Sequence, residues 1–169
     1  YVPTAPSVAS TMFDLVVSAS SIFGGNWEAG AGAIAAENQA LRWLADLAGF
    51  PAGAGGVFVS GGSAANLSAL VTAREVFAQH RGGRPQRYTV AVTEEVHASV
   101  RAAARVMDID VLPVHTDAHG RMTGAALEAA LADHARDSVF AVVATGGTTN
   151  AGVIDELDAI ADVCEARVL

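Results

Sequence analysis

Residues 56–67 read Gly56-Val57-Phe58-Val59-Ser60-Gly61-Gly62-Ser63-Ala64-Ala65-Asn66-Leu67, and this stretch decides the fold. It predicts a buried strand over 56–60, then a glycine turn, then a helix that begins near Ser63 and runs to about residue 80. Glycine lets the backbone approach a ligand closely, and the first N–H groups of a helix have no partner within it. Because those groups and the helix dipole favour an anion, we expect the turn Gly61-Gly62-Ser63 to bind a phosphate.

Two common phosphate-binding motifs are absent from this turn. A P-loop needs a lysine and a serine or threonine after its second glycine, and the dinucleotide fingerprint needs three spaced glycines. The residues from Gly61 to Asn66 supply neither, and no acidic residue follows where a ribose would require one. The chain also has no lysine, since all ten of its basic residues are arginine. A generic nucleotide-binding domain is therefore disfavoured.

Composition narrows the class of protein. A length of 169 residues suits one domain or part of a larger one, and a hydrophobic fraction of 51% can form a sizeable core. The net charge of -8 and the lack of a basic run argue against a nucleic-acid partner. No apolar run approaches the ~20 residues that a membrane span requires, so we expect no membrane partner.

Cys164 is the one cysteine, so the chain has no disulfide of its own, and a reducing cytoplasm is the expected location. It shares a helical stripe with Leu157 and Ile160, which predicts a core thiol rather than a nucleophile. No signal peptide is apparent. Tyr1 is not an initiator methionine, and residues 167–169 resemble the end of a helix followed by the start of a strand. We therefore expect more protein on both sides.

Helical and strand patterns alternate along the chain. Helices are expected over residues 7–20, 33–48, 63–80, 97–107, 125–134 and 155–166, and strands over 56–60, 88–92, 109–114 and 139–144. Thr123 is the expected N-cap of the fifth helix. This alternation predicts an α/β fold with a mostly parallel sheet covered by helices on both faces. We divide the chain into a helical segment over 1–50 and an alternating, ligand-binding part over 51–169.

Three polar or glycine-rich clusters follow predicted strands. They are Gly61-Gly62-Ser63, Glu94-Glu95-Val96-His97 and Thr145-Gly146-Gly147-Thr148-Thr149-Asn150. Ligands of parallel α/β sheets bind beyond the carboxyl ends of the strands, so we expect these clusters to meet in space. By contrast, His115 and His119 lie in a predicted loop without a third ligand, so no metal site is expected.

Four segments, in this order and spacing, carry a family resemblance. They are Tyr1-Val2-Pro3-Thr4, Ser60-Gly61-Gly62-Ser63-Ala64-Ala65-Asn66-Leu67, Val96-His97-Ala98-Ser99-Val100 and Ala144-Thr145-Gly146-Gly147-Thr148-Thr149-Asn150-Ala151-Gly152. Together they span nearly the whole chain. The chain resembles the group II pyridoxal 5′-phosphate-dependent decarboxylases, the family of aromatic-L-amino-acid, glutamate and diaminobutyrate decarboxylases. The resemblance implies a truncated large domain of the fold-type-I pyridoxal phosphate enzymes, as in aspartate aminotransferase.

The resemblance assigns cofactor-binding residues. Gly62 and Ser63 match the positions that hold the cofactor phosphate, although Ser63 alone would also suit an ordinary helix N-cap. His97 matches the histidine that stacks on the pyridine ring, and an imidazole there suits a catalytic proton donor. Thr149 matches a threonine beside the ring, near its 3′ oxygen. Asp155 is a further cofactor-binding candidate, although an acid is favourable at any helix start.

The substrate pocket is assigned to Tyr1 and Thr4 by the same resemblance, with a frayed terminus as the alternative. In the family, the lysine that forms a Schiff base with the cofactor, and the acid that keeps its pyridine nitrogen protonated, both follow the region matched here. We therefore expect this piece alone to be inactive, and the parent protein to be a homodimer that binds pyridoxal 5′-phosphate and an amino-acid substrate.

The expected reaction of the parent protein is decarboxylation of an L-amino acid to an amine and CO2. Two alternatives stay open. Another fold-type-I enzyme, such as an aminotransferase or a carbon–carbon lyase, would keep the fold and change the reaction. A module used only for binding or assembly would explain the missing lysine. The sequence does not identify the amino acid.

Overall fold

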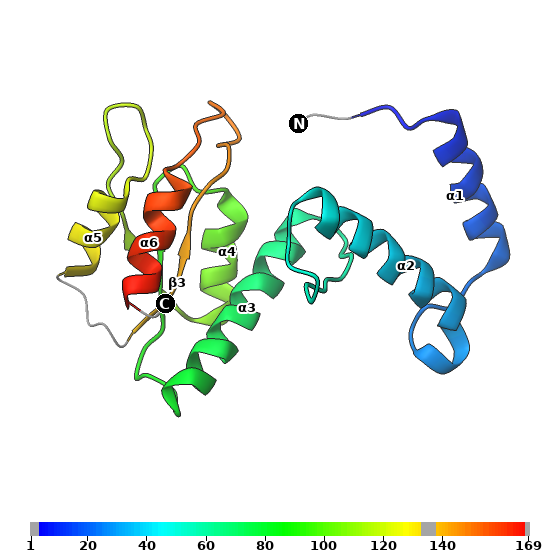
Figure 1. Cartoon of the computed structure of the whole chain (residues 1–169), viewed down its shortest axis with the longest axis horizontal. Coiled ribbons are helices and arrows are strands. Elements are labelled where there is room, and N and C mark those ends of the chain that lie inside the picture. The colour runs from blue at the N-terminus through cyan, green and yellow to red at the C-terminus, as the bar shows by residue number, and fades with distance from the viewer. Residues whose placement is uncertain (1–3, 133–137, 168–169) are drawn as a thin grey trace. The chain divides into compact units, whose positions relative to one another are not determined.

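The computed structural model describes residues 4–132 and 138–167 (Figure 1). The chain separates into two compact units, the first ending at Phe58 and the second beginning at Val59. Within the described ranges, no helix combines the length and the apolar character needed to cross a membrane.

The first unit consists of two helices, α1 (Val8–Ser20) and α2 (Trp27–Leu47). Ser7 caps α1, since its hydroxyl accepts the N–H of Ser10 at 3.1 Å, and Asn26 caps α2 by accepting the N–H of Ala29 at 2.9 Å. α2 therefore begins before the predicted residue 33: the glycine-rich stretch behind Asn26 is helical, with one non-helical residue at Gly30. A Cβ on Gly30 would lie 2.3 Å from the Phe23 carbonyl oxygen, so glycine is required there.

Large apolar side chains of the first unit remain exposed. Within the part of α1 and α2 that the structure describes, only Gly30 and Ala45 are buried. Phe13 is 72% exposed, Trp43 60% and Leu47 85%. The apolar side chains whose spacing predicted these helices are therefore largely uncovered within the first unit.

The second unit is built on a parallel three-stranded sheet in the order β2-β1-β3. Its elements, in chain order, are α3 (Gly62–Arg81), β1 (Thr89–Val92), α4 (Ala98–Met107), β2 (Asp110–Pro113), α5 (Gly124–Ala132), β3 (Val139–Val143) and α6 (Leu157–Arg167). Thr89 lies opposite Asp110 of β2 and Val139 of β3 in the register of the central strand.

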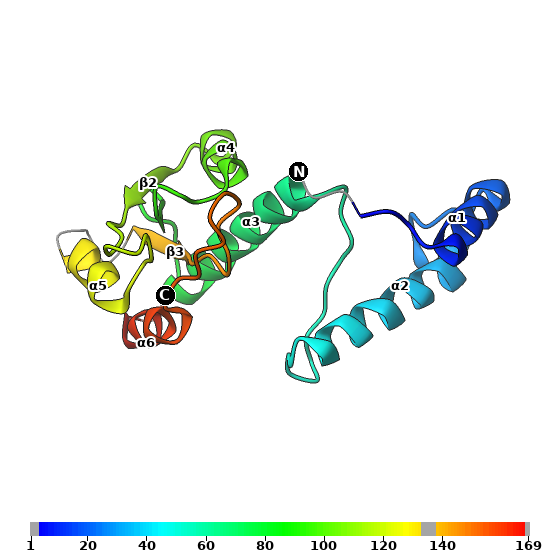
Figure 2. The ribbon, with the colours of Figure 1, turned by 90° about the horizontal axis from the view of Figure 1, so that it is seen from above.

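Both faces of the sheet are covered by helices (Figures 1 and 2). Val90 and Val92 point toward α3 and α4, where they pack with Leu70 and Val100. Ala91 points the other way, into the cluster under α5 and α6. All four residues of β1 are buried. The predicted α/β architecture is confirmed, and its continuous apolar strands follow from burial on both faces.

The predicted strand over 56–60 is wrong. Residues 54–59 have no regular secondary structure, and the side chains of Val57 and Phe58 are 66% and 54% exposed. A strand persists only when a neighbour pairs its backbone groups, and no described residue pairs with this segment as a strand. The N–H of Phe58 instead donates to the Glu37 carboxylate at 3.1 Å.

Most other predicted bounds agree with the structure to within one or two residues. The hydroxyl of Thr123 accepts the N–H of Ala126 at 3.1 Å, which confirms the predicted cap of α5, while residue 134 lies outside the described residues. α6 begins at Leu157 rather than at Asp155. Both carboxylate oxygens of Asp155 are used elsewhere, so it does not lie in the first turn of that helix.

Cys164 is expected to react slowly with a thiol-alkylating reagent in the folded protein. It packs against the cluster under α5 and α6, and this partial burial raises the pKa of its thiol. Because the thiolate is the nucleophile, a raised pKa lowers the reactive fraction at neutral pH. Peptide mapping by mass spectrometry after timed exposure to iodoacetamide measures the rate. Equal rates in folded and urea-unfolded protein would contradict this prediction.

Candidate functional site

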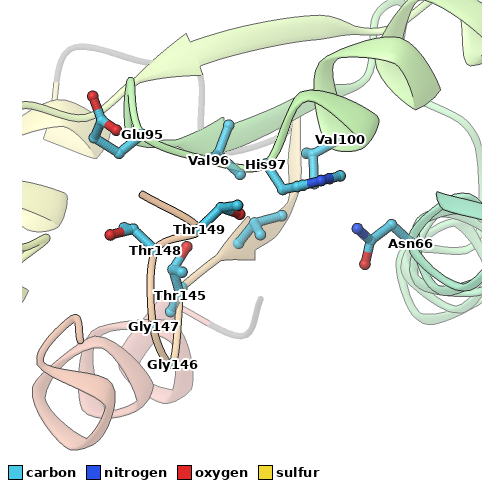
Figure 3. A pocket seen from close by; sticks show the side chains of 12 residues that line it. Asn66, Glu95, Val96, His97, Val100, Thr145, Gly146, Gly147, Thr148 and Thr149 are labelled. Carbon is cyan, nitrogen blue, oxygen red and sulfur yellow. The ribbon is translucent and has the colours of Figure 1, made fainter. Parts of the chain in front are cut away.

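A cavity of about 220 Å³ lies beyond the carboxyl ends of β1 and β3 (Figure 3). One wall is the segment from Glu95 to His97, which follows β1, and the other is the loop from Thr145 to Thr149, which follows β3. Asn66 of α3 also lines the cavity, together with Val100, Val143 and Ala144. Two of the three clusters expected at the strand ends therefore meet in one pocket.

The order of the strands explains this position. From β1 the chain crosses to β2 on one side, and later returns to place β3 on the other side of β1. The connections that leave β1 and β3 therefore diverge, and they leave a crevice between the two strand ends. Such a point of divergence is where ligands bind in open parallel sheets.

His97 is the N-cap residue of α4 and sits in a chain of hydrogen bonds. Its Nδ1 lies 3.3 Å from the backbone nitrogen of Ser99 and 2.7 Å from the Ser99 hydroxyl. The side-chain amide of Asn66 donates to that hydroxyl at 2.7 Å. Ser99 is only 7% exposed, whereas His97 is exposed at the pocket wall.

The loop after β3 is held by hydrogen bonds at its base. The Asp155 carboxylate accepts the N–H groups of Thr145 and Met122, each at 2.7 Å. Further up, Thr148 is buried, and its hydroxyl accepts the N–H of Val153 at 3.1 Å. Gly147 has a φ of 146°, which side chains rarely tolerate. These bonds fix the turn that carries the exposed Thr149 into the pocket.

The start of α3 has the features of an anion-binding helix end. Its N-cap is Gly61, with a φ of 133°, and no side chain caps the helix there. The N-cap is therefore not Ser63, which lies exposed within the first turn. A Cβ on Gly62 would meet no atom within 4 Å, so the backbone at this end is open to a ligand.

The predicted site residues lie in different parts of the structure. His97 and Thr149 line the cavity together. Ser63 precedes the lining residue Asn66 by one helical turn, and residues three apart share one side of a helix. Asp155 is not a lining residue and instead anchors the loop. Thr4 is exposed ahead of α1 in the first unit, and Tyr1 lies outside the described residues.

Sequence reasoning missed Asn66 and Ser99 as site residues. Both lie within the family motifs, but neither was predicted to have a role. A signal was present for each: Asn66 follows Ser63 at helical spacing, and Ser99 is a polar residue next to Val100 in a helix with an apolar face. The bond between them joins residues 33 positions apart, so it depends on how α3 and α4 pack.

The chain matches known proteins over nearly its whole length. A family model described as "Pyridoxal-dependent decarboxylase conserved domain" matches residues 1–168. The chain is 34% identical to the aromatic-L-amino-acid decarboxylase of Bacillus atrophaeus, over 97% of this chain and 35% of the relative. It is 35% identical to the L-2,4-diaminobutyrate decarboxylase of Rhizobium meliloti, over 95% and 33%. The chain thus spans about a third of the length of these curated relatives.

Solved structures agree with the sequence matches. The crystal structure of Oryza sativa TDC with PLP and tryptamine has a TM-score of 0.84 and 28% identity, and covers 97% of this chain and 39% of its own. Mouse CSAD in the apo form has a TM-score of 0.87 and 28% identity, over 98% and 37%.

Proposed function

The chain belongs to the pyridoxal-dependent decarboxylase family, and we propose that the protein containing it converts an L-amino acid into an amine and CO2 with pyridoxal 5′-phosphate as cofactor. The observation that carries this proposal is the pocket between β1 and β3. This pocket brings together His97 and Thr149 at the carboxyl ends of these two strands. The family resemblance assigns both residues to the cofactor ring.

The residues present fit the cofactor. A phosphate dianion needs several hydrogen-bond donors that no protein side chain already occupies. The start of α3 at Gly61 offers backbone N–H groups of this kind, because no side chain caps the helix there. A pyridine ring needs flat contacts and hydrogen-bonding groups near its edge, which the His97 imidazole and the Thr149 hydroxyl supply. We therefore assign the phosphate to Gly62 and Ser63, and the ring to the space between His97 and Thr149.

The roles of this chain's residues follow from those positions. When bound, pyridoxal 5′-phosphate accepts the electrons of the bond between the α-carbon and the carboxylate. The Gly62-Ser63 turn fixes one end of the cofactor, and His97 presents a ring nitrogen to the reacting group. Asp155 keeps the Thr145–Thr149 loop in place. Since the chain has no lysine, the covalent link to the cofactor requires a lysine elsewhere in the whole protein.

The test uses the full-length protein. After addition of pyridoxal 5′-phosphate and removal of the excess, we expect a visible absorption band that stays with the protein. A panel of aromatic, acidic and diamine L-amino acids should include one that yields equal amounts of amine and CO2. A keto acid would identify an aminotransferase, and an aldehyde a carbon–carbon lyase. Failure to retain the cofactor would overturn the proposal.

Ser63→Ala is expected to weaken cofactor retention about 10-fold or more. A hydrogen bond to a charged group contributes about 1.5–3 kcal/mol, and this serine lies in the first turn of α3. The dissociation constant is measured by absorbance titration of the cofactor-free protein. Ser68→Ala, a change at an exposed serine farther along α3, is the matched control and should bind normally. Equal affinities of the two variants would contradict the phosphate assignment.

We also propose that the whole protein is a homodimer that works in the cytoplasm. The exposed apolar side chains of α1 and α2, such as Phe13 and Leu47, support an oligomer because so large an apolar surface favours a partner. The lone Cys164 suits a reducing compartment. Sedimentation of the full-length protein measures its oligomeric state, and a monomer would contradict this part of the proposal.

A further inference from the structure

We propose that Asn66 and Ser99 are positioning residues that hold His97 as the neutral tautomer with its proton on Nε2. Only the catalytic consequence of this inference rests on the proposed function. The structural part rests on three hydrogen bonds, which link α3 to α4 and then to the wall of the pocket.

The direction of each bond follows from the groups involved. The amide nitrogen of Asn66 can only donate, so the Ser99 oxygen accepts its proton at 2.7 Å. The Ser99 hydroxyl then has its own proton available for Nδ1 of His97, also at 2.7 Å. The chain of bonds therefore runs from amide to hydroxyl to imidazole.

A second, longer contact at Nδ1 favours the same tautomer as the Ser99 hydroxyl does. The backbone N–H of Ser99 points at the same Nδ1, with 3.3 Å between the two nitrogens. A proton on Nδ1 would face this N–H, which cannot turn away because it belongs to the first turn of α4. Nδ1 must therefore carry a lone pair, and a neutral imidazole then carries its proton on Nε2.

The other ring nitrogen of His97, Nε2, is available to a ligand in the pocket. No described residue forms a hydrogen bond with Nε2, and His97 lines the cavity. The Nε2 N–H is thus a donor for an acceptor atom of the bound substrate. Ser99, at the centre of the network, is buried, so water has little access to its hydroxyl.

Placement of Asn66 connects the two ends of the proposed site. It lies one helical turn after Ser63 on α3, and its amide reaches Ser99 on α4. The helix whose first turn is assigned to the phosphate therefore also sets the orientation of His97. A cofactor held at that end meets an imidazole whose proton already faces the pocket.

The decisive measurement is nitrogen NMR of the histidine rings in full-length, cofactor-free protein labelled with ¹⁵N-histidine. The His97 signals are assigned by their loss in His97→Gln. We expect Nε2 to show the shift of a protonated nitrogen and Nδ1 that of an acceptor. Ser99→Ala removes the hydroxyl at 2.7 Å and leaves Nδ1 with only the longer 3.3 Å backbone contact, so the tautomers should mix, whereas Ser99→Thr, which retains the hydroxyl, should restore the wild-type pattern. A proton on Nδ1 in the wild type, or an unchanged pattern in Ser99→Ala, would overturn the inference.

Steady-state kinetics test the catalytic consequence. We expect Ser99→Ala and Asn66→Ala each to lower kcat about 10-fold while leaving cofactor affinity within about 2-fold, in line with the loss of one hydrogen bond. Asn38→Ala, at an exposed asparagine of α2, is the control. Should Ser99→Ala fail to fold, the wild-type spectrum still decides the tautomer, and Asn66→Ala still tests the catalytic consequence. Because the NMR needs no cofactor, loss of the proposed activity and loss of the tautomer are separate results.

Discussion

Replacing His97 with alanine is expected to lower kcat about 100-fold or more while the protein keeps its cofactor, since a positioned proton donor contributes about 10²- to 10⁴-fold. The imidazole lines the pocket from the end of β1, and it is hydrogen-bonded to Ser99 and not to the Gly62-Ser63 turn. Its loss should therefore affect the chemical step more than binding. Amine formation at saturating substrate measures the first effect, and retained absorbance of the cofactor the second.

A histidine away from the pocket provides the matched control for this prediction. His115 is exposed in the segment after β2 and is not a lining residue of the cavity. His115→Ala should keep wild-type turnover. Wild-type turnover in His97→Ala would refute the role given to His97, and equal losses in both variants would point to a general effect on folding.

Replacing Asp155 with alanine is expected to destabilise the protein by about 3 kcal/mol, because it leaves two buried or partly buried N–H groups without an acceptor. The two donors, Met122 and Thr145, come from opposite ends of the α5–β3 region. The same carboxylate therefore ties the pocket loop to the segment before α5. Cofactor affinity should fall with stability, since Thr149 is carried by that loop.

Urea denaturation of the cofactor-free protein measures the loss of stability. Asp155→Asn retains one acceptor oxygen but places an NH2 group against the second N–H, so it should also be destabilised. Asp162→Ala changes an exposed acid of α6 and should remain within about 0.5 kcal/mol of the wild type. A stable Asp155→Ala variant with normal cofactor affinity would show that the loop is held by other contacts.

The sequence predicted those parts of the fold that depend on local pattern. The helices and the three strands of the sheet follow from periodicity, and the N-cap at Thr123 follows from side-chain chemistry close by in the chain. The strand over 56–60 was wrong because apolar character does not provide a partner strand. The early start of α2 was missed because glycines behind Asn26 resemble a loop, although the Asn26 cap starts a helix there.

In the site, too, local features could be predicted from the sequence and long-range contacts could not. Turn chemistry and the family motifs pointed to Gly62, Ser63, His97 and Thr149, each beside a strand or helix end. The bond of Asn66 to Ser99 and that of Asp155 to Met122 could not be predicted, because each joins residues 33 positions apart. Asp155 was expected to bind the cofactor from its place before the last helix, and in the structure its two carboxylate oxygens accept backbone N–H groups.

The order β2-β1-β3 also has a consequence for synthesis of the protein on the ribosome. A nascent chain presents Asn66 and His97 long before Thr149, and until β3 has emerged one edge of β1 is unpaired. Unpaired strand edges promote aggregation. The pocket wall is complete only when Asp155 has been translated and has tied down the loop. Cofactor binding at this pocket can therefore aid folding only after that point.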